Sequence, residues 1–397
     1  MIQKMVWAGS NLNSYAQAED ALRVLCGQSI SGRRIRRQTE EVGRARITER
    51  EAGVRNLKSL TFPDRRSGSP IAPAPELAVI MMDGGRYQRR DHFGQSNETG
   101  AVLQKHWRES KVGCLLTMQS RPQGEDPCFL IPKSFVHASV VRELAKMAEK
   151  QGSNELERAL GEDSVNNAVP LNDIDYEPPQ LISRDVVASS QTAEEFGWQL
   201  ESRAFQLNFP SAQRIAFVAD GAKTNWRIQE HHFPRATPIA DLIHALSYVW
   251  SAAQASGDPN TYDQWAQWIW QGEASKVIAE LERLQCTLGL PPQNAPANDP
   301  RQRVDRTLTY LSNNSHHMNY PEYRRKGLPI TSSHIESTVK QINRRIKGSE
   351  KFWLKASSEC ILQLRADYLS ESNPMPTFWN RWLANQTGSN QYLQNAS

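Results

Sequence analysis

The chain has 397 residues and a net charge of +4, and 23% of its residues are charged. Its mean hydropathy is −0.62, and its longest apolar run, Leu77 to Met82, is far shorter than the roughly 20 residues that span a bilayer. The chain does not begin with a charged segment followed by an apolar stretch, so the sequence does not predict a secretory signal peptide. The five cysteines are scattered without a CxxC pair, which argues against a disulfide framework or zinc module and favours a cytoplasmic location.

Positive charge is concentrated in two segments. Residues 1–70 carry 13 Lys and Arg against 7 Asp and Glu, and residues 321–355 carry 9 against 3, so the rest of the chain is net negative. Two basic segments on an otherwise acidic protein favour a polyanionic partner that is held at defined places. If charge is the only evidence considered, a charged surface that simply faces solvent explains these two segments equally well.

Residues 1–70 are predicted to form a basic helical segment that ends in a linker. An amphipathic helix is expected over 14–26, and Ser31 is placed to cap a second helix after a short turn. This is the outline of a helix-turn-helix, although ordinary helical hairpins share it. Residues 61–76 are rich in Pro, Ser and Gly and predict the linker. The second helix carries the candidate DNA-binding residues Arg33, Arg34, Arg36 and Arg37.

The pattern then changes to one typical of an α/β fold. Residues 77–83 form a short apolar run that predicts a buried strand, and Gly84–Gly85 predicts a turn into a second strand. Further strands and helices alternate along the chain, which predicts a mixed sheet flanked by helices. The further strands are expected at 112–118, 215–220 and 236–240, and the helices at 135–151 and 193–205.

The C-terminal half is predicted to be mainly helical. Residues 240–315 are helical in pattern and rich in Trp, as in an inserted helical subdomain. Ile335, Val339, Ile342 and Ile346 are spaced to form one apolar face of a helix over 333–347. A last helix is expected at 357–369.

Three acidic residues occupy positions that suit metal-dependent phosphodiester chemistry. Asp83 and Asp220 each follow a predicted buried strand, and Glu336 borders the apolar face of the helix over 333–347. Phosphodiester hydrolysis and transfer use two divalent cations about 3.5–4 Å apart, and Mg²⁺ is held chiefly by oxygen ligands. Two strand ends and one helix at a sheet edge would bring three carboxylates together.

Each acid also has a structural explanation when it is taken alone. Asp83–Gly84 is a hairpin-turn signal, Asp220 is placed to cap a helix, and Ser333-x-x-Glu336 spells a capping box. Their joint order of strand, strand and helix favours the shared catalytic function.

Five blocks of sequence resemble the DDE transposases of bacterial insertion sequences, in the ISKra-type group related to Mutator-like elements. The blocks cover most of the chain from residue 77 onward. They are MMDGGRYQRRD around Asp83, WRESKVG at 107–113, FVADGAKTNW around Asp220, DLIHAL at 241–246, and YPEYRRKGLPITSSHIESTVKQINRRIKGSEKFW at 320–353.

The resemblance implies an RNase H-like catalytic core at 71–250 and 326–397, interrupted by an all-helical insertion at 251–325. It implies that Asp83, Asp220 and Glu336 hold two Mg²⁺ ions, for which Mn²⁺ can substitute. Water would first cleave at the transposon end, and the released 3′-hydroxyl would then attack target DNA. The implied partners are the double-stranded terminal inverted repeats and the target DNA. A homodimer or higher synaptic oligomer in the bacterial cytoplasm, associated with the nucleoid and not with a membrane, is also implied.

Asp241-x-x-His244 matches a [C/D]xxH motif of the Mutator-like relatives and implies a secondary position beside the catalytic centre. An N-capping Asp and a core His explain the same spacing. Mg²⁺ prefers oxygen ligands, so His244 is not expected to bind it. Beside Glu336, the basic residues Lys340, Arg344, Arg345 and Lys347 are candidates for DNA phosphate contacts.

The N-terminal region is shorter than in many relatives, which carry a cysteine-containing zinc module there. An N-terminally truncated or decayed transposase that binds DNA without transposing is therefore one alternative. An RNase H-like nuclease that cuts without joining strands is the other.

Overall fold

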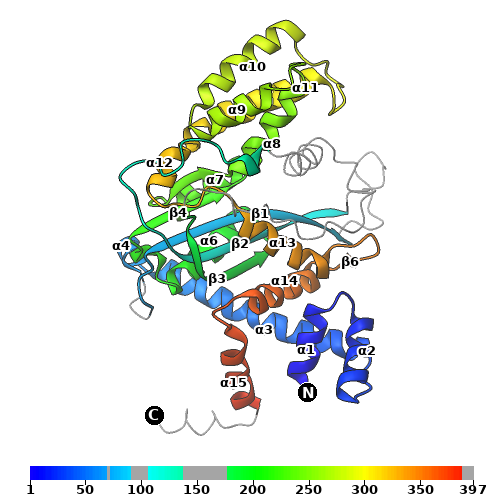
Figure 1. The fold of residues 1–397 in the computed structure, drawn as a ribbon. Coiled ribbons are helices and arrows are strands. Elements are labelled where there is room, and N and C mark those ends of the chain that lie inside the picture. The colour runs from blue at the N-terminus through cyan, green and yellow to red at the C-terminus, as the bar shows by residue number, and fades with distance from the viewer. Residues whose placement is uncertain (69–71, 91–105, 137–176, 387–397) are drawn as a thin grey trace.

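The computed structural model describes residues 1–68, 72–90, 106–136 and 177–386 (Figure 1). Its centre is a six-stranded mixed sheet in the order β3-β2-β1-β4-β5, with β6 paired to the far end of β1. The pairs β1–β2 and β2–β3 are antiparallel, whereas β4 and β6 run parallel to β1, and β5 runs parallel to β4. The predicted mixed α/β sheet is therefore confirmed. The strands are β1 (Leu77–Arg89), β2 (Trp107–Gln119), β3 (Gln180–Ser189), β4 (Arg214–Ala219), β5 (Thr237–Ala240) and β6 (Phe352–Trp353).

Helices cover both faces of this sheet. On one face α13 packs against β1 and β2 and α14 packs against β3, and α6 packs against β2 and β3 on the other face. The described α-helices are α1 (Ile2–Asn11), α2 (Tyr15–Cys26), α3 (Gly32–Ser59), α4 (Phe62–Ser67), α6 (Ala193–Gln206), α7 (Lys223–His232), α8 (Leu242–Ala253), α9 (Thr261–Trp270), α10 (Ala274–Leu288), α11 (Pro300–Asn314), α12 (Tyr320–Arg325), α13 (Ser333–Ile346), α14 (Lys355–Leu369) and α15 (Pro374–Gln386).

The predicted turn at Gly84–Gly85 is wrong, because β1 continues through both glycines while paired with β2. The missing side chain of Gly85 has another use. A Cβ atom there would lie 2.7 Å from Asn343 Oδ1 on α13 and 3.0 Å from Ser110 Oγ on β2. Gly85 thus allows α13 to approach the strand closely, which is one of the structural uses of glycine within a sheet.

Other predictions differ in their outcome. The helices over 14–26, 193–205, 333–347 and 357–369 and the strands over 112–118, 215–220 and 236–240 are confirmed within a few residues. The linker at 61–76 is partly wrong, because it contains α4. Strand β3 was not predicted. Most of the helix expected at 135–151 lies outside the described residues, which include only the 3₁₀ turn Lys133–Phe135.

The segment between residues 251 and 325 contains only helices, which rise above the sheet (Figure 1). Its tryptophans are structural: Trp265 and Trp270 are buried, and Trp270 Nε1 donates a 2.7 Å hydrogen bond to the Cys128 carbonyl. The apolar core of these helices is continuous with the core beneath the sheet. These helices are therefore held against the sheet by shared packing.

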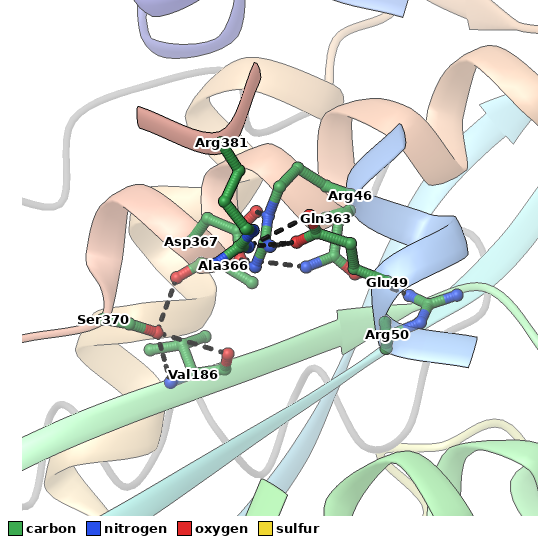
Figure 2. Close-up of polar contacts among 9 residues, drawn as sticks. All are labelled: Arg46, Glu49, Arg50, Val186, Gln363, Ala366, Asp367, Ser370 and Arg381. Carbon is green, nitrogen blue, oxygen red and sulfur yellow. Dashed lines mark hydrogen bonds and ion pairs between the residues drawn. The ribbon is translucent and has the colours of Figure 1, made fainter. Parts of the chain in front are cut away.

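The N-terminal helices are attached to the C-terminal ones through α3 and α14. Gly43 of α3 packs so closely that an added Cβ atom would lie 2.5 Å from Cys360 Cβ. Figure 2 shows the polar contacts beside this crossing, where Arg46 donates to Asp367 over 2.9 Å and Arg50 donates to Gln363 over 3.0 Å. The end of α14 is tied to the sheet by a 2.9 Å hydrogen bond from the Val186 N–H to Ser370 Oγ. Segments about 320 residues apart thus form one packed layer.

Candidate metal centre

Three aspartates lie in a row across three neighbouring parallel strands. Met82 on β1 is paired with Ala219 on β4, and Ala219 is paired with Ala240 on β5. The next residue after each of these is Asp83, Asp220 and Asp241, respectively. Because adjacent strands are about 4.8 Å apart, the three Cα atoms are close neighbours although the chain separates them widely. The sequence predicts that Asp83 and Asp220 lie together at one edge of the sheet, and the register of β1 and β4 puts the two residues side by side.

Helix α13 brings Glu336 to the same edge. The residues of its apolar face, Ile335, Val339, Ile342 and Ile346, are all buried against the sheet. The capping box proposed for Ser333 and Glu336 is not formed, because the N-cap is Ser332 and no side chain makes a capping hydrogen bond. The Glu336 carboxylate is thus not used by the helix terminus. One of its oxygens lies within 4.8 Å of ligand atoms of Asp241 and His244.

The hydrogen bonds of Asp83 and Asp220 leave acceptor capacity on both carboxylates. Asp83 Oδ1 accepts from the N–H of Gly84 at 2.6 Å, and the hairpin-turn explanation of this residue is wrong because β1 continues past it in register with β2. Asp220 Oδ1 accepts from the Ala222 N–H and from Asn225 Nδ2, each at 2.9 Å. The cap of α7 itself is Ala222. Each carboxylate has a second oxygen for which the described residues show no donor.

Asp241 is fully buried and makes hydrogen bonds with both of its oxygens. Oδ1 caps α8 by accepting from the N–H of Ile243 at 2.6 Å, and Oδ2 accepts from the Ser332 N–H at 3.1 Å and from the Ser332 hydroxyl. Asp241 therefore joins the start of α8 to the start of α13. The capping alternative for Asp241 is confirmed, and this capping positions both His244 and Glu336.

His244 is not a simple core histidine. Its Nδ1 atom lies 3.6 Å from Asp241 Oδ2, which is ion-pair distance for a protonated imidazole although it is longer than a hydrogen bond. Burial lowers the pKa of the imidazole, but Asp241 and the charges of Asp220 and Asp83 outweigh burial and raise the pKa to about 9.

Burial, with smaller contributions from neighbouring carboxylates, raises the pKa of Asp83 and of Glu336. Burial raises the pKa of Asp83 to about 6, with further contributions from Asp220 and Asp241, while His244 opposes them. Burial and Asp241 raise the pKa of Glu336 to about 7, against the opposing charges of His244 and Lys340. Negative charges that are gathered without enough positive partners favour the binding of a cation. Asp241, His244 and Glu336 together form a group that could hold a metal ion.

Two tyrosines beside the acids were missed by sequence reasoning. The ring of Tyr248 on α8 stacks on that of Tyr310 on α11, with centroids 4.0 Å apart, and the charge of Asp220 contributes to the raised pKa of each phenol. Tyr248 follows His244 by four residues, so helical spacing could have identified it. Tyr310 has no local sequence signal, since it reaches the site only through the packing of α11.

The structure separates the candidate DNA-binding residues into two groups. Most are exposed: Arg33, Arg34, Arg36 and Arg37 on the first turns of α3, and Lys340, Arg344 and Lys347 along α13 or directly after it. Arg36 also pairs with Glu40 at 2.8 Å. Arg345 is a correction, because it is only 3% exposed and donates to the carbonyl of Gly9 at 3.0 Å. Its guanidinium joins the N-terminal helices to α13, so Arg345 is not part of the exposed basic surface of α13.

No protein-family model matches the chain, and no curated protein matches it significantly. Among the described helices, none is both long enough and apolar enough to cross a membrane.

Proposed function

We propose that this protein is a DDE-type DNA transposase with an RNase H-like core, in which Asp83, Asp220 and Glu336 hold two divalent metal ions. The observation that carries the proposal is the row of aspartates across three adjacent parallel strands, with Asp83 inside β1 and Asp220 and Asp241 directly after β4 and β5. Glu336 on α13 lies beside this row. Asp83, Asp220 and Glu336 each lie within one of the five sequence blocks that resemble such transposases.

The available ligand atoms fit hard divalent cations. Asp83 and Asp220 each have a carboxylate oxygen, Oδ2, that accepts no hydrogen bond from the described residues, and Glu336 is not engaged in a helix cap. When two ions are bound, they activate an attacking oxygen and stabilise a leaving oxygen. Asp241 is a positioning residue that joins α8 to α13 and so sets where Glu336 lies. His244 counters part of the negative charge.

The proposed substrate is DNA bound along α13. Lys340 follows Glu336 by one helical turn, and Arg344 and Lys347 extend the positive charge away from the acids. Such residues would place a strand by its phosphates without reading its sequence. The proposed reactions are hydrolysis at the transposon end and attack of the released 3′-hydroxyl on a target phosphodiester.

A strand-transfer assay tests this proposal. Labelled DNA that carries the inverted repeats flanking the coding sequence is incubated with the full chain, Mg²⁺ or Mn²⁺, and a target plasmid. We expect cleaved and joined products, and their loss in Asp83→Asn, Asp220→Asn and Glu336→Gln. The exposed Glu282→Gln substitution on α10 is the matched control and should retain activity.

Two other functions predict different products in this assay. Cleavage without joining would indicate an RNase H-like nuclease, and binding without cleavage would indicate a transposase that has lost its activity. Full activity in all three acid variants would contradict the assigned site.

A further inference from the structure

A second candidate site lies at the opposite end of α13 from Glu336. It is a pocket of about 420 Å³, within the size range of small-molecule sites. Residues from the α1–α2 loop, α3, β6 and the start of α14 surround it, and these elements lie together in Figure 1. Its lining includes three aromatic residues, Tyr15, Phe352 and Trp353, and four basic ones, Arg36, Arg90, Arg345 and Lys351.

The buried guanidinium of Arg345 points to an anionic ligand. Its plane lies over the rings of Tyr15 and Trp353, with Cζ 4.6 Å and 4.9 Å from their centroids. One of its terminal nitrogens, Nη2, has no hydrogen-bond partner, and no carboxylate pairs with it among the described residues. An arginine does not lose its proton in proteins, so burial without a counter-charge is costly unless an anion binds.

Neighbouring arginines add to this positive charge. Arg365 on α14 is also buried and donates to the carbonyl of Gln341 at 3.0 Å and to Asn11. Burial and the charges of Arg345 and Arg344 together lower the pKa of Arg365 to about 10. These three arginines come from two adjacent helices.

The N-terminus of α14 opens onto the same pocket. Leu354 and Ser357 line it, no side chain caps this 15-residue helix, and its first backbone hydrogen bond runs from the Ser358 N–H to Leu354. The N–H groups before Ser358 and the helix dipole favour an anion there. Two acids moderate the charge: Glu350 lines the pocket, and Glu40 accepts from both Arg36 and Ser357.

We propose that this pocket binds one unpaired nucleotide of the DNA, with its phosphate at the start of α14 above Arg345 and its base against Phe352. The combination of an anion site with aromatic lining residues favours a nucleotide over a simple anion, because bases stack on aromatic side chains. The two basic segments of the sequence meet here, since Arg36 comes from one and Arg345 and Lys351 from the other.

The position suits a nucleotide near the cleavage point. Gln88, which pairs with Phe352, is five residues beyond Asp83 on β1, and Arg345 is nine residues beyond Glu336 on α13. At the usual rise per residue, both spacings put the pocket about 14–17 Å from the acids. That distance corresponds to roughly four or five base-pair steps.

The test measures binding to the full chain in EDTA, so that metal chemistry does not contribute. The probe is a fluorescein-labelled thymidine single strand of about ten nucleotides, a length within the usual range of single-strand sites. We expect thymidine 5′-monophosphate to compete better than inorganic phosphate, thymidine or an oligoglutamate peptide. Bound probe should slow hydrogen exchange over residues 351–358.

Variants assign this binding to the pocket. Lys351→Gln and Phe352→Leu should each weaken probe binding by about five- to tenfold, and Arg345→Gln should weaken it further if it folds. The matched control is Lys276→Gln on α10, which should bind as the native chain does. Equal competition by phosphate or by the peptide would overturn the nucleotide assignment, and unchanged binding in Lys351→Gln and Phe352→Leu would overturn the site.

This inference uses the proposed DNA partner but not the proposed metal chemistry. Asp83→Asn should abolish strand transfer and retain probe binding and exchange protection. Strand transfer without pocket binding would count against the pocket alone, whereas pocket binding without cleavage in the native chain would count against the transposase proposal alone.

Discussion

Replacing Glu336 with Gln should stabilise the metal-free protein at neutral and higher pH. Burial and Asp241 raise the pKa of Glu336 from 4.5 to about 7, so its charged form is disfavoured in the folded state. At 1.36 kcal/mol for each pKa unit, the charge destabilises the fold by about 3 kcal/mol above pH 7. For a chain of this length, that corresponds to a rise in Tm of about 4 °C for Glu336→Gln.

The pH dependence of this effect has a defined sign. A carboxyl group whose folded pKa is raised favours folding fully below its unfolded pKa of 4.5, and this contribution is lost as the pH rises through about 7. The native chain and Glu336→Gln should therefore have similar stability near pH 4 and should diverge between about pH 4.5 and 7.

The assay is urea unfolding, followed by tryptophan fluorescence in EDTA at several pH values. The exposed Glu350→Gln is the control and should change stability by less than about 0.5 kcal/mol. Saturating Mn²⁺ should stabilise the native chain more than Glu336→Gln, because a ligand at about 100 times its Kd contributes about 2.7 kcal/mol. A metal-free Glu336→Gln that is less stable than the native chain at pH 8 would refute the reasoning.

Three further predictions concern packing, protons and positioning. Gly43→Ala should destabilise the fold by about 1–3 kcal/mol, because the new methyl group would meet the backbone of Cys360. Gly53→Ala is the control, since its methyl group would contact only the ends of side chains. Equal effects of the two substitutions in thermal unfolding would contradict the close crossing of α3 and α14. Mn²⁺ must displace the proton of Asp83 or Glu336 when the pH lies below the raised pKa of that group. Mn²⁺ affinity measured by calorimetry should therefore fall as the pH is lowered, by about tenfold per pH unit for each displaced proton. An affinity that does not change from pH 5 to 8 would argue against these ligands. Asp241→Ala should cost about 1–3 kcal/mol by removing the cap of α8 and the acceptor for Ser332, and a neutral result in urea unfolding would show that the junction of α8 and α13 does not depend on this carboxylate.

Sequence patterns were sufficient where one local rule decides the structure. The apolar spacing in α13 and the short apolar runs of β1 and β4 each specify an element and the side of it that is buried. The acids at 83, 220 and 336 could be selected because each borders such an element. Their structural alternatives are not formed: β1 does not turn at Asp83, the N-cap of α7 is Ala222 and not Asp220, and Glu336 makes no capping box. The N-cap explanation does hold for Asp241.

Other features depend on contacts between distant segments and leave no local pattern. Gly85 resembles a turn signal, but its small size serves the approach of α13. Strand β3 contains a buried charged residue, Asp185, which pairs with Arg203 at 2.7 Å. Because a charged residue does not fit the apolar pattern of a buried strand, the sequence gives no clear signal for β3. Arg345 has the same local context as Arg344, yet one is buried under the N-terminal helices and the other is exposed. The direction of a side chain on a helix is decided here by what packs against it.

Anomalous diffraction from Mn²⁺-soaked crystals tests the central claim most directly. The account predicts two anomalous peaks about 3.5–4 Å apart, with Asp83, Asp220 and Glu336 as protein ligands, and loss of at least one peak in Asp220→Asn. A single peak bound only by Asp241 and His244, or no peak near the three acids at saturating Mn²⁺, would contradict it.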